Sequence, residues 1–345
     1  MNKNLKNDPT DKCEVFSKAD YSFAKGVENL VDPISVGTIH FIQQLNSLLP
    51  KKIQELIMKK SSQKTPSMGF VVEPYSSFLC YKIKDLNNAQ KLLTSSFELI
   101  KTSVFEDDKP DYYCIIGSFK AHTSAFWGAR TEFYVIARDK RTNLLSWIII
   151  DYDTNTISYD TKKGLASPNS DSVITINHRG ELFVDIHNKN SDRKCVYNFN
   201  VENGKMKNLD QRLWLEGNLS IGYGKELSDS QDSVFSLKFE PCEVEKALNI
   251  NPKEIKNLEN NWFKELIEDK PSVVVCFPYA QHFVSDSPGY SSAIKNKKEL
   301  IEKVNSIDFS KTKVFSTKSL KNMMIMGLML STITTITLLV LYLSK

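Results

Sequence analysis

The chain has 345 residues, of which 41% are hydrophobic and 25% are charged, so its composition is that of a globular protein. Its 45 basic and 41 acidic residues leave a net charge of only +4. This balance excludes the strongly basic surface typical of nucleic-acid-binding proteins, and no nucleic-acid partner is expected.

Residues 1–66 are predicted to form an N-terminal arm and a helical segment. Residues 1–32 are polar and show no periodic pattern, which is typical of a loose arm. Across residues 34–60 the apolar side chains recur at helical spacing, with an interruption at Pro50. The following SSQKTPS, residues 61–67, has the composition of a linker.

Residues 67–306 are predicted to form a mainly β (α+β) domain. Residues 69–83 alternate between apolar and polar types and carry β-branched and aromatic side chains, and Asp85 is expected to cap a short helix after them. Strand-like runs separated by polar turns then follow one another from residue 97 to residue 201. Such a series suggests a closed barrel or a sandwich, since closing a sheet removes its edges.

The rest of this domain is predicted to mix strands and helices. Two further strands are expected at residues 234–241 and 272–280, and the intervening residues 243–269 are expected to be partly helical. Residues 293–306 are expected to form a charged helix. No internal repeat is visible.

Residues 323–343, MMIMGLMLSTITTITLLVLYL, contain no charged side chain. As an α-helix these residues would be about 31 Å long, which matches a hydrocarbon core of about 30 Å. The Ser and Thr hydroxyls within the run can bond back to helix carbonyls. The alternative is a buried core helix, which usually keeps a polar stripe. The sequence therefore predicts a transmembrane helix that holds the protein in a lipid bilayer.

The orientation of this predicted anchor follows from the charges beside it. Residues 307–322 form a juxtamembrane stalk with four lysines, Lys311, Lys313, Lys318 and Lys321, which favour a cytoplasmic position for that side. The N-terminus shows no apolar signal segment. We expect a single-pass C-terminal tail anchor with the soluble domain facing the cytoplasm.

The metal-binding and redox residue types show no functional spacing. The six cysteines are widely separated, several lie in apolar runs, and reduced buried thiols are expected, in agreement with the cytoplasm. The five histidines have no close metal-ligand spacing, so no metal or cofactor is predicted. The four tryptophans are expected in the core or in the wall of a barrel lumen.

Three polar side chains recur at every second position in the segment ARTEFYVIAR, residues 129–138. If this segment is a strand, Arg130, Glu132 and Tyr134 share one face, and Thr131 and its odd-numbered neighbours share the other. The polar face could line the lumen of a barrel or could simply face solvent, and the pattern alone leaves both interpretations open.

Two adjacent lysines, Lys162 and Lys163, lie in a polar turn after a strand. The chain has three other such pairs, so a pair by itself is uninformative. A lysine attacks a carbonyl only as the free amine, and a neighbouring ammonium or an apolar pocket lowers its pKa enough to populate that form. The turn is either an ordinary solvated turn or a reactive site.

The order of these features resembles the acetoacetate decarboxylase family. The resemblance covers residues 70–280 and rests on FLCYKIKDLNNAQKLL, a strand with Thr-Glu (Thr131, Glu132), an acidic pair (Asp151, Asp153) and a Lys-Lys turn that runs into Leu-Ala-Ser-Pro. It implies a cone-like, closed antiparallel β-barrel with flanking helices and a lysine in its interior.

The resemblance also implies residue roles. Lys162 would form a Schiff base, Lys163 would lower the pKa of Lys162, and Glu132 would be the pocket carboxylate, whereas Arg130 could replace an arginine that the family has earlier in its chain. The turn departs from the family pattern, because it lacks an aromatic-proline approach and has Asp160 two residues before Lys162. A nearby carboxylate raises the pKa of a lysine and opposes its activation.

Two functions are therefore expected. The first is a membrane-tethered Schiff-base lyase that decarboxylates a small keto acid or carries out a related aldol or dehydration step. The second is the same barrel without catalysis, binding a small or lipid-like ligand or a protein partner at the membrane. A structural membrane protein without a pocket is a third reading, and a homo-oligomer remains open.

Overall fold

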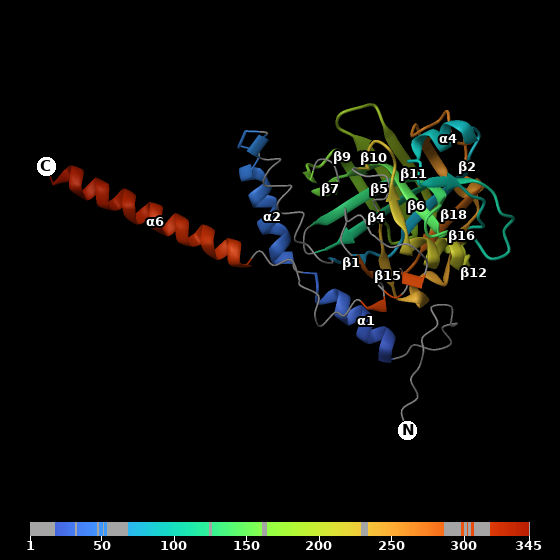
Figure 1. The fold of residues 1–345 in the computed structure, drawn as a ribbon, viewed down its shortest axis with the longest axis horizontal. Coiled ribbons are helices and arrows are strands. Elements are labelled where there is room, and N and C mark those ends of the chain that lie inside the picture. Colours follow the sequence, from blue (N-terminus) through green and yellow to red (C-terminus); the bar gives the residue numbers. More distant parts are fainter. Residues whose placement is uncertain are drawn as a thin grey trace, which may run out of the picture.

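The structure is a computed structural model that describes residues 18–31, 33–46, 48–50, 52–53, 68–123, 126–160, 164–228, 234–285, 298–299, 302, 305–306 and 318–344. Figure 1 shows a β-rich body, with helices α1 (Lys18–Glu28) and α2 (Pro33–Asn46) on one side and α6 (Lys318–Leu343) extending away from it. The predicted linker, the lysine pair and most of the predicted helix at 293–306 and of the stalk lie outside the described residues.

The larger sheet has 13 strands. Their bounds are β1 (Met68–Val72), β2 (Ser76–Lys82), β3 (Phe97–Leu99), β4 (Tyr113–His122), β5 (Trp127–Asp139), β6 (Leu145–Thr154), β12 (Lys205–Asn208), β13 (Ile221–Tyr223), β14 (Val234–Phe235), β15 (Leu237–Phe239), β16 (Lys246–Ile250), β18 (Val273–Phe277) and β19 (Gln281–Ser285). The main path is β12-β16-β18-β2-β4-β5-β6-β13-β14, and β1, β3, β15 and β19 join beside it.

The prediction of a closed antiparallel barrel is wrong on two points. The sheet is open, because its path ends at β12 and β14 and these strands do not pair with each other. Strand β14 has only two residues, and β15 directly after it pairs with β19 instead of continuing the path. In addition, β13 runs parallel to β6.

A second, four-stranded antiparallel sheet has the order β17-β11-β10-β9. It contains β9 (Ser170–Ile176), β10 (Glu181–Asn188), β11 (Lys194–Asn200) and β17 (Lys256–Asn260). A separate short hairpin joins β7 (Ser158–Asp160) to β8 (Gly164–Ala166).

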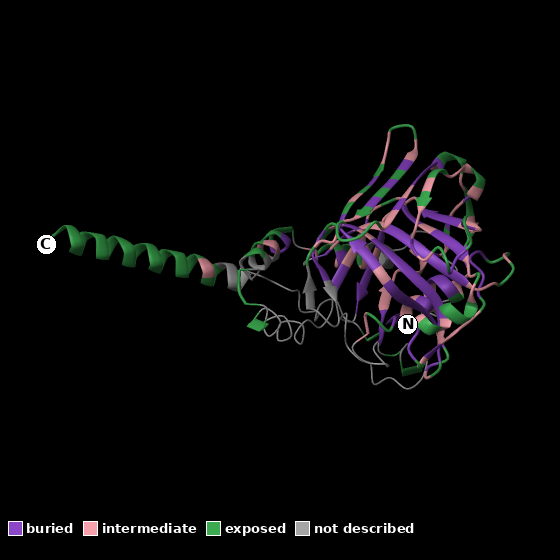
Figure 2. Cartoon of the chain, turned by 90° about the horizontal axis from the view of Figure 1, so that it is seen from above, coloured by how far each residue is buried: buried purple, intermediate pink, exposed green. Residues whose placement is uncertain are grey.

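The central strands of the larger sheet are buried on both faces. One face, with Phe133 and Val135, packs against apolar side chains of the second sheet such as Val184 and Tyr197. The opposite face, with Tyr134 and Trp147, belongs to a second cluster of buried apolar side chains, which also contains Trp214 and Phe277. Figure 2 shows this continuous buried layer. Both faces of β5 are therefore interior, and its polar face does not point to solvent.

The predicted strands between residues 69 and 201 are confirmed at β1, β2, β3, β4, β5, β6, β9, β10 and β11, and the two later ones at β14, β15 and β18. The helical prediction for residues 243–269 is largely wrong, since these residues contain β16, β17 and the short turns η4 (Pro241–Val244) and η5 (Pro252–Glu254). Strand pairing with β18 and β11 decides their conformation, although KALNI and KNLEN contain few β-branched residues. Further short turns are η1 (Val201–Asn203), η2 (Arg212–Glu216) and η3 (Gly217–Leu219).

The helices are partly as predicted. Asp85 caps α4 (Leu86–Leu92) by accepting a hydrogen bond from the backbone N–H of Asn88 at 3.0 Å, and α2 confirms the first part of the helical segment. Helix α1 was not expected, because its residues fall in the predicted loose arm. It forms because Val27 and Leu30 are buried against β1 and β19.

Gly69 of β1 allows this close packing of α1. A Cβ atom at Gly69 would lie 2.7 Å from the Cβ of Leu30, so only glycine lets the helix approach the strand. Helix α1 is also tied by an ion pair, because Glu28 lies 3.3 Å from the ring Nε2 of His282, whose Nδ1 contacts Glu243 at 2.6 Å. The contact with Glu28 holds α1 against β19, and the contact with Glu243 holds the ring of His282 in place.

The cysteines agree with the prediction at four positions. Cys80, Cys114, Cys195 and Cys276 are free and buried, and burial raises their thiol pKa values. Cys242, in the turn η4, is disulfide-bonded, so the expectation of six reduced thiols is wrong there.

One helix among the described residues is long and apolar enough to cross a membrane. Within Asn322–Leu343, the most apolar window of 18 residues has a mean hydropathy of 2.1, and none of this window is buried. The hydroxyls of Thr332, Thr334, Thr335 and Thr337 donate to the carbonyls four residues earlier at 2.8–2.9 Å, as the sequence suggested. These bonds satisfy the polar groups of an otherwise apolar helix.

Candidate functional site

A cavity of about 160 Å³ lies on the face of β5 that carries Tyr134. Its wall is mainly aromatic. Phe78, Trp147 and Trp214 form one side, with ring centroids of Phe78 and Trp147 at 5.2 Å from that of Trp214. A second group of lining rings is centred on Phe283, whose ring centroid lies 4.8 Å from that of Phe70 and 4.6 Å from that of Phe239. The size and lining suit a small ring or a short apolar chain, since an apolar cavity of about 150 Å³ accepts benzene.

The polar part of this wall is supplied by Arg130, Glu132 and Tyr134. Their two-residue spacing on β5 places all three on the cavity face, which confirms the predicted common face and, of the two interpretations left open, favours an interior position. Glu132 accepts a hydrogen bond from Nε of Arg130 with one carboxylate oxygen and from the hydroxyl of Tyr134 with the other. Only 13% of the Arg130 side chain and 8% of the Glu132 side chain are exposed.

Arg130 is held in two ways but retains unused donors. Burial disfavours its charged form, but the charge and hydrogen bond of Glu132, together with the nearby hydroxyls of Tyr152 and Tyr223, outweigh burial and raise the pKa of the guanidinium. The guanidinium carbon lies 4.1 Å from the centroid of the Tyr152 ring. Within the part of the chain that the structure describes, no hydrogen bond uses the terminal nitrogens Nη1 and Nη2 of Arg130. These donors are available to a ligand in the cavity.

Tyr134 is a hydrogen-bond donor at physiological pH. Burial, reinforced by the adjacent charge of Glu132, raises the pKa of its hydroxyl well above the ordinary value. The hydroxyl therefore stays protonated and keeps one carboxylate oxygen of Glu132 occupied. Each carboxylate oxygen of Glu132 thus accepts one hydrogen bond.

The predicted acidic pair, Asp151 and Asp153, does not face the cavity. The register between β5 and β6 shifts between Phe133 and Tyr134, so that Ile150 is an extra residue in β6. Before this bulge, Trp147 and Ile149 line the cavity, whereas after it Tyr152 contacts Arg130 and the two aspartates point to the opposite face. Because of the bulge, the odd-numbered residues of β6 face the cavity before Ile150 and face the opposite side after it.

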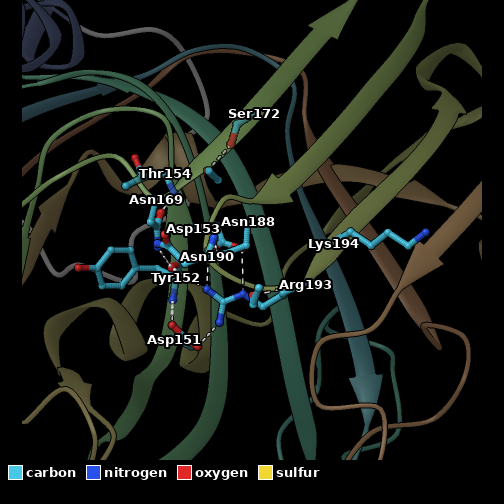
Figure 3. Close-up of polar contacts among 12 residues, drawn as sticks. Asp151, Tyr152, Asp153, Thr154, Asn169, Ser172, Asn188, Asn190, Arg193 and Lys194 are labelled. Carbon is cyan, nitrogen blue, oxygen red and sulfur yellow. Dashed lines mark hydrogen bonds and ion pairs between the residues drawn. The ribbon is translucent and has the colours of Figure 1, made fainter.

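Both aspartates form ion pairs with Arg193, as Figure 3 shows. It follows β10 and precedes β11, so the ion pairs join the two sheets. Its Nε donates to Oδ2 of Asp153 at 3.0 Å, its terminal nitrogens contact Asp151 and Asp153, and its guanidinium lies 4.5 Å from the Trp262 ring centroid. Burial raises the pKa of Asp153 although Arg193 and Asn188 oppose this effect. This cluster has the geometry of a structural connection.

The predicted lysine turn lies between two described strands. Asp160 pairs with Gly164 in the β7–β8 hairpin, so residues 161–163, which include Lys162 and Lys163, form its connection and lie outside the described residues. The hairpin begins beside the site, because the Ser158 hydroxyl lies 3.2 Å from the hydroxyl of Tyr152. The catalytic roles of Lys162, Lys163, Glu132 and Arg130 remain predictions.

The aromatic residues of the cavity wall were mostly missed by sequence reasoning. Only the tryptophans were expected in the core or in a cavity wall. Trp147, Trp214 and Trp262 are buried as expected, whereas Trp127 is 46% exposed. Phe70, Phe235 and Phe283 lie in short strands far apart in the sequence. No local pattern reveals that the sheet brings them together.

Fold and site together define a β-rich protein with an aromatic cavity that contains a nearly buried arginine–glutamate pair. No family model and no curated protein matches the chain. Among solved structures, the chain is similar to acetoacetate decarboxylase from Legionella pneumophila, with 13% identity over 64% of this chain and 84% of that chain and a TM-score of 0.38. This likeness is distant and concerns the fold alone.

Proposed function

We propose that the protein binds a small, mainly apolar molecule with one uncharged acceptor group, such as a carbonyl, in the aromatic cavity. The observation that carries this proposal is the position of Arg130, nearly buried in an apolar wall with two terminal nitrogens unused by the described residues. The terminal nitrogens are not among the fully buried side-chain atoms that lack a partner, so they are accessible from the cavity, where an acceptor on a ligand can replace water. Aromatic rings supply the remaining contact area.

The charge balance of the site favours an uncharged acceptor. Glu132 already neutralises Arg130, and Tyr134 donates to the same carboxylate. A ligand carbonyl would accept from the guanidinium without adding charge. A ligand carboxylate would bring a second negative charge close to Glu132 in a poorly solvated space.

Three probes of similar ring size test the proposal on the full chain: acetophenone, benzoate and toluene. We expect acetophenone to quench the fluorescence of Trp147 and Trp214 saturably and to bind about tenfold more tightly than toluene, since a hydrogen bond to a charged group contributes about 1.5–3 kcal/mol. Benzoate should bind more weakly than acetophenone.

A paired variant isolates the polar group. Arg130→Met combined with Glu132→Leu removes both charges together, so neither is left unpaired, and should abolish the preference for acetophenone over toluene. Arg179→Met, a change in an exposed turn, is the matched control and should preserve it. Equal binding of both probes to the unaltered protein, or no saturable binding, would refute the proposal.

A second candidate is Schiff-base chemistry at Lys162. The observation that favours it is the contact between Ser158 at the start of the hairpin and Tyr152, which stacks on Arg130. In this reaction the amine of Lys162 adds to a keto carbonyl, and water leaves as the imine forms. The bond to the carboxylate then breaks, its electrons move to the iminium nitrogen, and CO₂ leaves before protonation and hydrolysis release the ketone. Arg130 would hold the carboxylate, and Glu132 would transfer protons.

Borohydride trapping tests this chemistry. The full chain is incubated with acetoacetate or acetopyruvate and reduced, and the modified lysine is mapped by mass spectrometry. The expected result is a stable adduct on Lys162 that disappears in Lys162→Ala and persists in Lys52→Ala, a lysine from another pair. If no lysine forms an adduct across a panel of keto acids, the non-catalytic binding function is the better account.

The membrane position completes the proposal. Helix α6 would span the bilayer as a tail anchor, and the lysines at its N-terminal side would keep the β-rich domain on the cytoplasmic face, where a disulfide such as that of Cys242 is rare. Ligand binding would then take place next to a membrane.

A further inference from the structure

Helix α2 has an inner face that attaches it to the β-rich body. Ser35 and Val36 are buried, and the ring Nε2 of His40 lies 3.3 Å from the hydroxyl of Thr156, in the connection between β6 and β7. The helix is therefore part of the folded body and presents a fixed outer surface.

The outer surface of this segment is apolar. Ile34, Phe41, Leu48 and Ile53 are exposed by 68%, 48%, 80% and 46%, and we call these four side chains the apolar ridge. Ile34 and Phe41 are seven residues apart on α2, which places them on one side of the helix, and Leu48 and Ile53 follow beyond the end of α2. Residues 33–50 contain no Asp, Glu, Lys or Arg. A helix facing water carries polar side chains on its outer side, so this surface requires another environment.

Two features indicate that a lipid bilayer is that environment. Lys51, Lys52, Lys59 and Lys60 follow the apolar residues in the sequence, and such lysines attract anionic lipid head groups. The apolar stretch of α6 begins at Asn322, and both Figure 1 and Figure 2 show the start of α6 beside α2. An apolar helix face followed by basic residues is typical of a helix that lies in the membrane interface.

We propose that the apolar ridge of α2 lies in the interface of the membrane that α6 enters and forms a second attachment of the domain. A single spanning helix leaves the attached domain free to tilt and rotate. A second contact at α2 fixes one side of the domain against the bilayer. The inference does not depend on which ligand the aromatic cavity binds.

Photo-cross-linking of the full chain in vesicles of phosphatidylcholine and phosphatidylserine tests this contact. The vesicles include a phosphatidylcholine with a diazirine in its acyl chain, and lipid adducts are mapped by mass spectrometry. We expect adducts in residues 33–53 as well as in residues 318–344. Adducts confined to α6, or adducts at neither helix, would overturn the proposal.

Two double variants sharpen the result. Ile34→Ser with Phe41→Ser changes exposed side chains only and should remove the adducts at α2 while those at α6 persist as an internal standard. Val173→Ser with Phe183→Ser, which changes exposed apolar residues of the second sheet, should leave the adducts at both helices unchanged. A chemical cross-link between the α2 helices of two copies, without lipid adducts at α2, would show a protein interface instead and contradict the proposal.

Discussion

Arg193→Ala is expected to lower the free energy of unfolding by about 3 kcal/mol or more, because it leaves Asp153 without its cation. Asp153 is fully buried, and Arg193 contacts it with two nitrogens while contacting Asp151 with a third. Arg193 itself remains 20% exposed, so the effect should lie near the lower end of the range of about 3–5 kcal/mol for broken buried ion pairs. Urea unfolding of the full chain, followed by tryptophan fluorescence, measures this loss, since all four tryptophans lie in the β-rich body.

The pH dependence of this loss follows from Asp153. Burial already raises the pKa of this carboxyl in the folded protein, and removal of Arg193 should raise it further. The folded variant then binds a proton that the unfolded chain binds only at lower pH, so its stability decreases as pH rises from the unfolded toward the folded pKa. The destabilisation by Arg193→Ala should accordingly be smaller at mildly acidic pH than at neutral pH.

Two further variants decide whether the loss comes from an unpaired charge. Arg193→Met combined with Asp151→Asn and Asp153→Asn removes the charges together and should cost less than Arg193→Ala alone. Arg179→Ala, in the exposed turn between β9 and β10, should change the free energy of unfolding by less than about 0.5 kcal/mol. A loss for Arg193→Ala no larger than for Arg179→Ala would contradict the structural connection between the two sheets.

Trp214→Ala is expected to lower the free energy of unfolding by about 3–5 kcal/mol, the range for deletion of a buried aromatic side chain. Trp214 is only 2% exposed, and its indole N–H donates to the carbonyl of Val104 at 2.9 Å. Its ring contacts Phe78, Trp147 and Phe277 at centroid distances of 5.2–5.3 Å. The substitution removes these contacts and leaves the backbone N–H of Asp210, at 3.1 Å, as the remaining donor to the Val104 carbonyl.

Trp127→Ala is the matched control for this experiment. Trp127 is 46% exposed and stacks against His122 with a centroid distance of 4.1 Å, so its loss should cost less than about 1 kcal/mol. Far-UV circular dichroism in urea follows both variants without relying on the deleted fluorophore. Equal losses for the two tryptophans would show that Trp214 is not part of a packed core.

The same substitution should change ligand size selectivity, because Trp214 is part of the cavity wall. Trp214→Ala enlarges the cavity, so the ratio of affinities for 2-acetonaphthone and acetophenone should rise relative to the unaltered protein. The ratio should not change in Trp127→Ala. An unchanged ratio in Trp214→Ala would place the binding site elsewhere.

Local patterns predicted the strands well but predicted their pairing poorly. Alternation in ARTEFYVIAR correctly placed Arg130, Glu132 and Tyr134 on one face, because side-chain direction in a strand depends only on a period of two. Applied to β6, the same rule would place Asp151 and Asp153 on the face of Trp147 and Ile149, because it cannot anticipate the extra residue Ile150. A bulge depends on the neighbouring strand, which the local sequence does not reveal.

The open sheet and the cavity wall depend on contacts between distant segments. The parallel pairing of β13 with β6 joins residues about 70 positions apart, and nothing within IGY at 221–223 indicates a partner. Helix α1 similarly becomes stable only when Val27 and Leu30 pack against β1 and β19. Its polar, irregular sequence therefore resembled an arm.

The open edge at β12 has a consequence for the solubility of the domain. An unpaired strand edge can add a strand from another molecule and so begin aggregation. Strand β12 is partly covered at this edge, because the backbone N–H of Glu106 donates to the carbonyl of Asn208 at 3.1 Å, and Lys207 lies 2.6 Å from Asp107 and 3.3 Å from Asp108 in the connection between β3 and β4. A strand from another molecule would have to displace these contacts before it could pair with β12. The sheet can thus remain open at this edge without recruiting further strands.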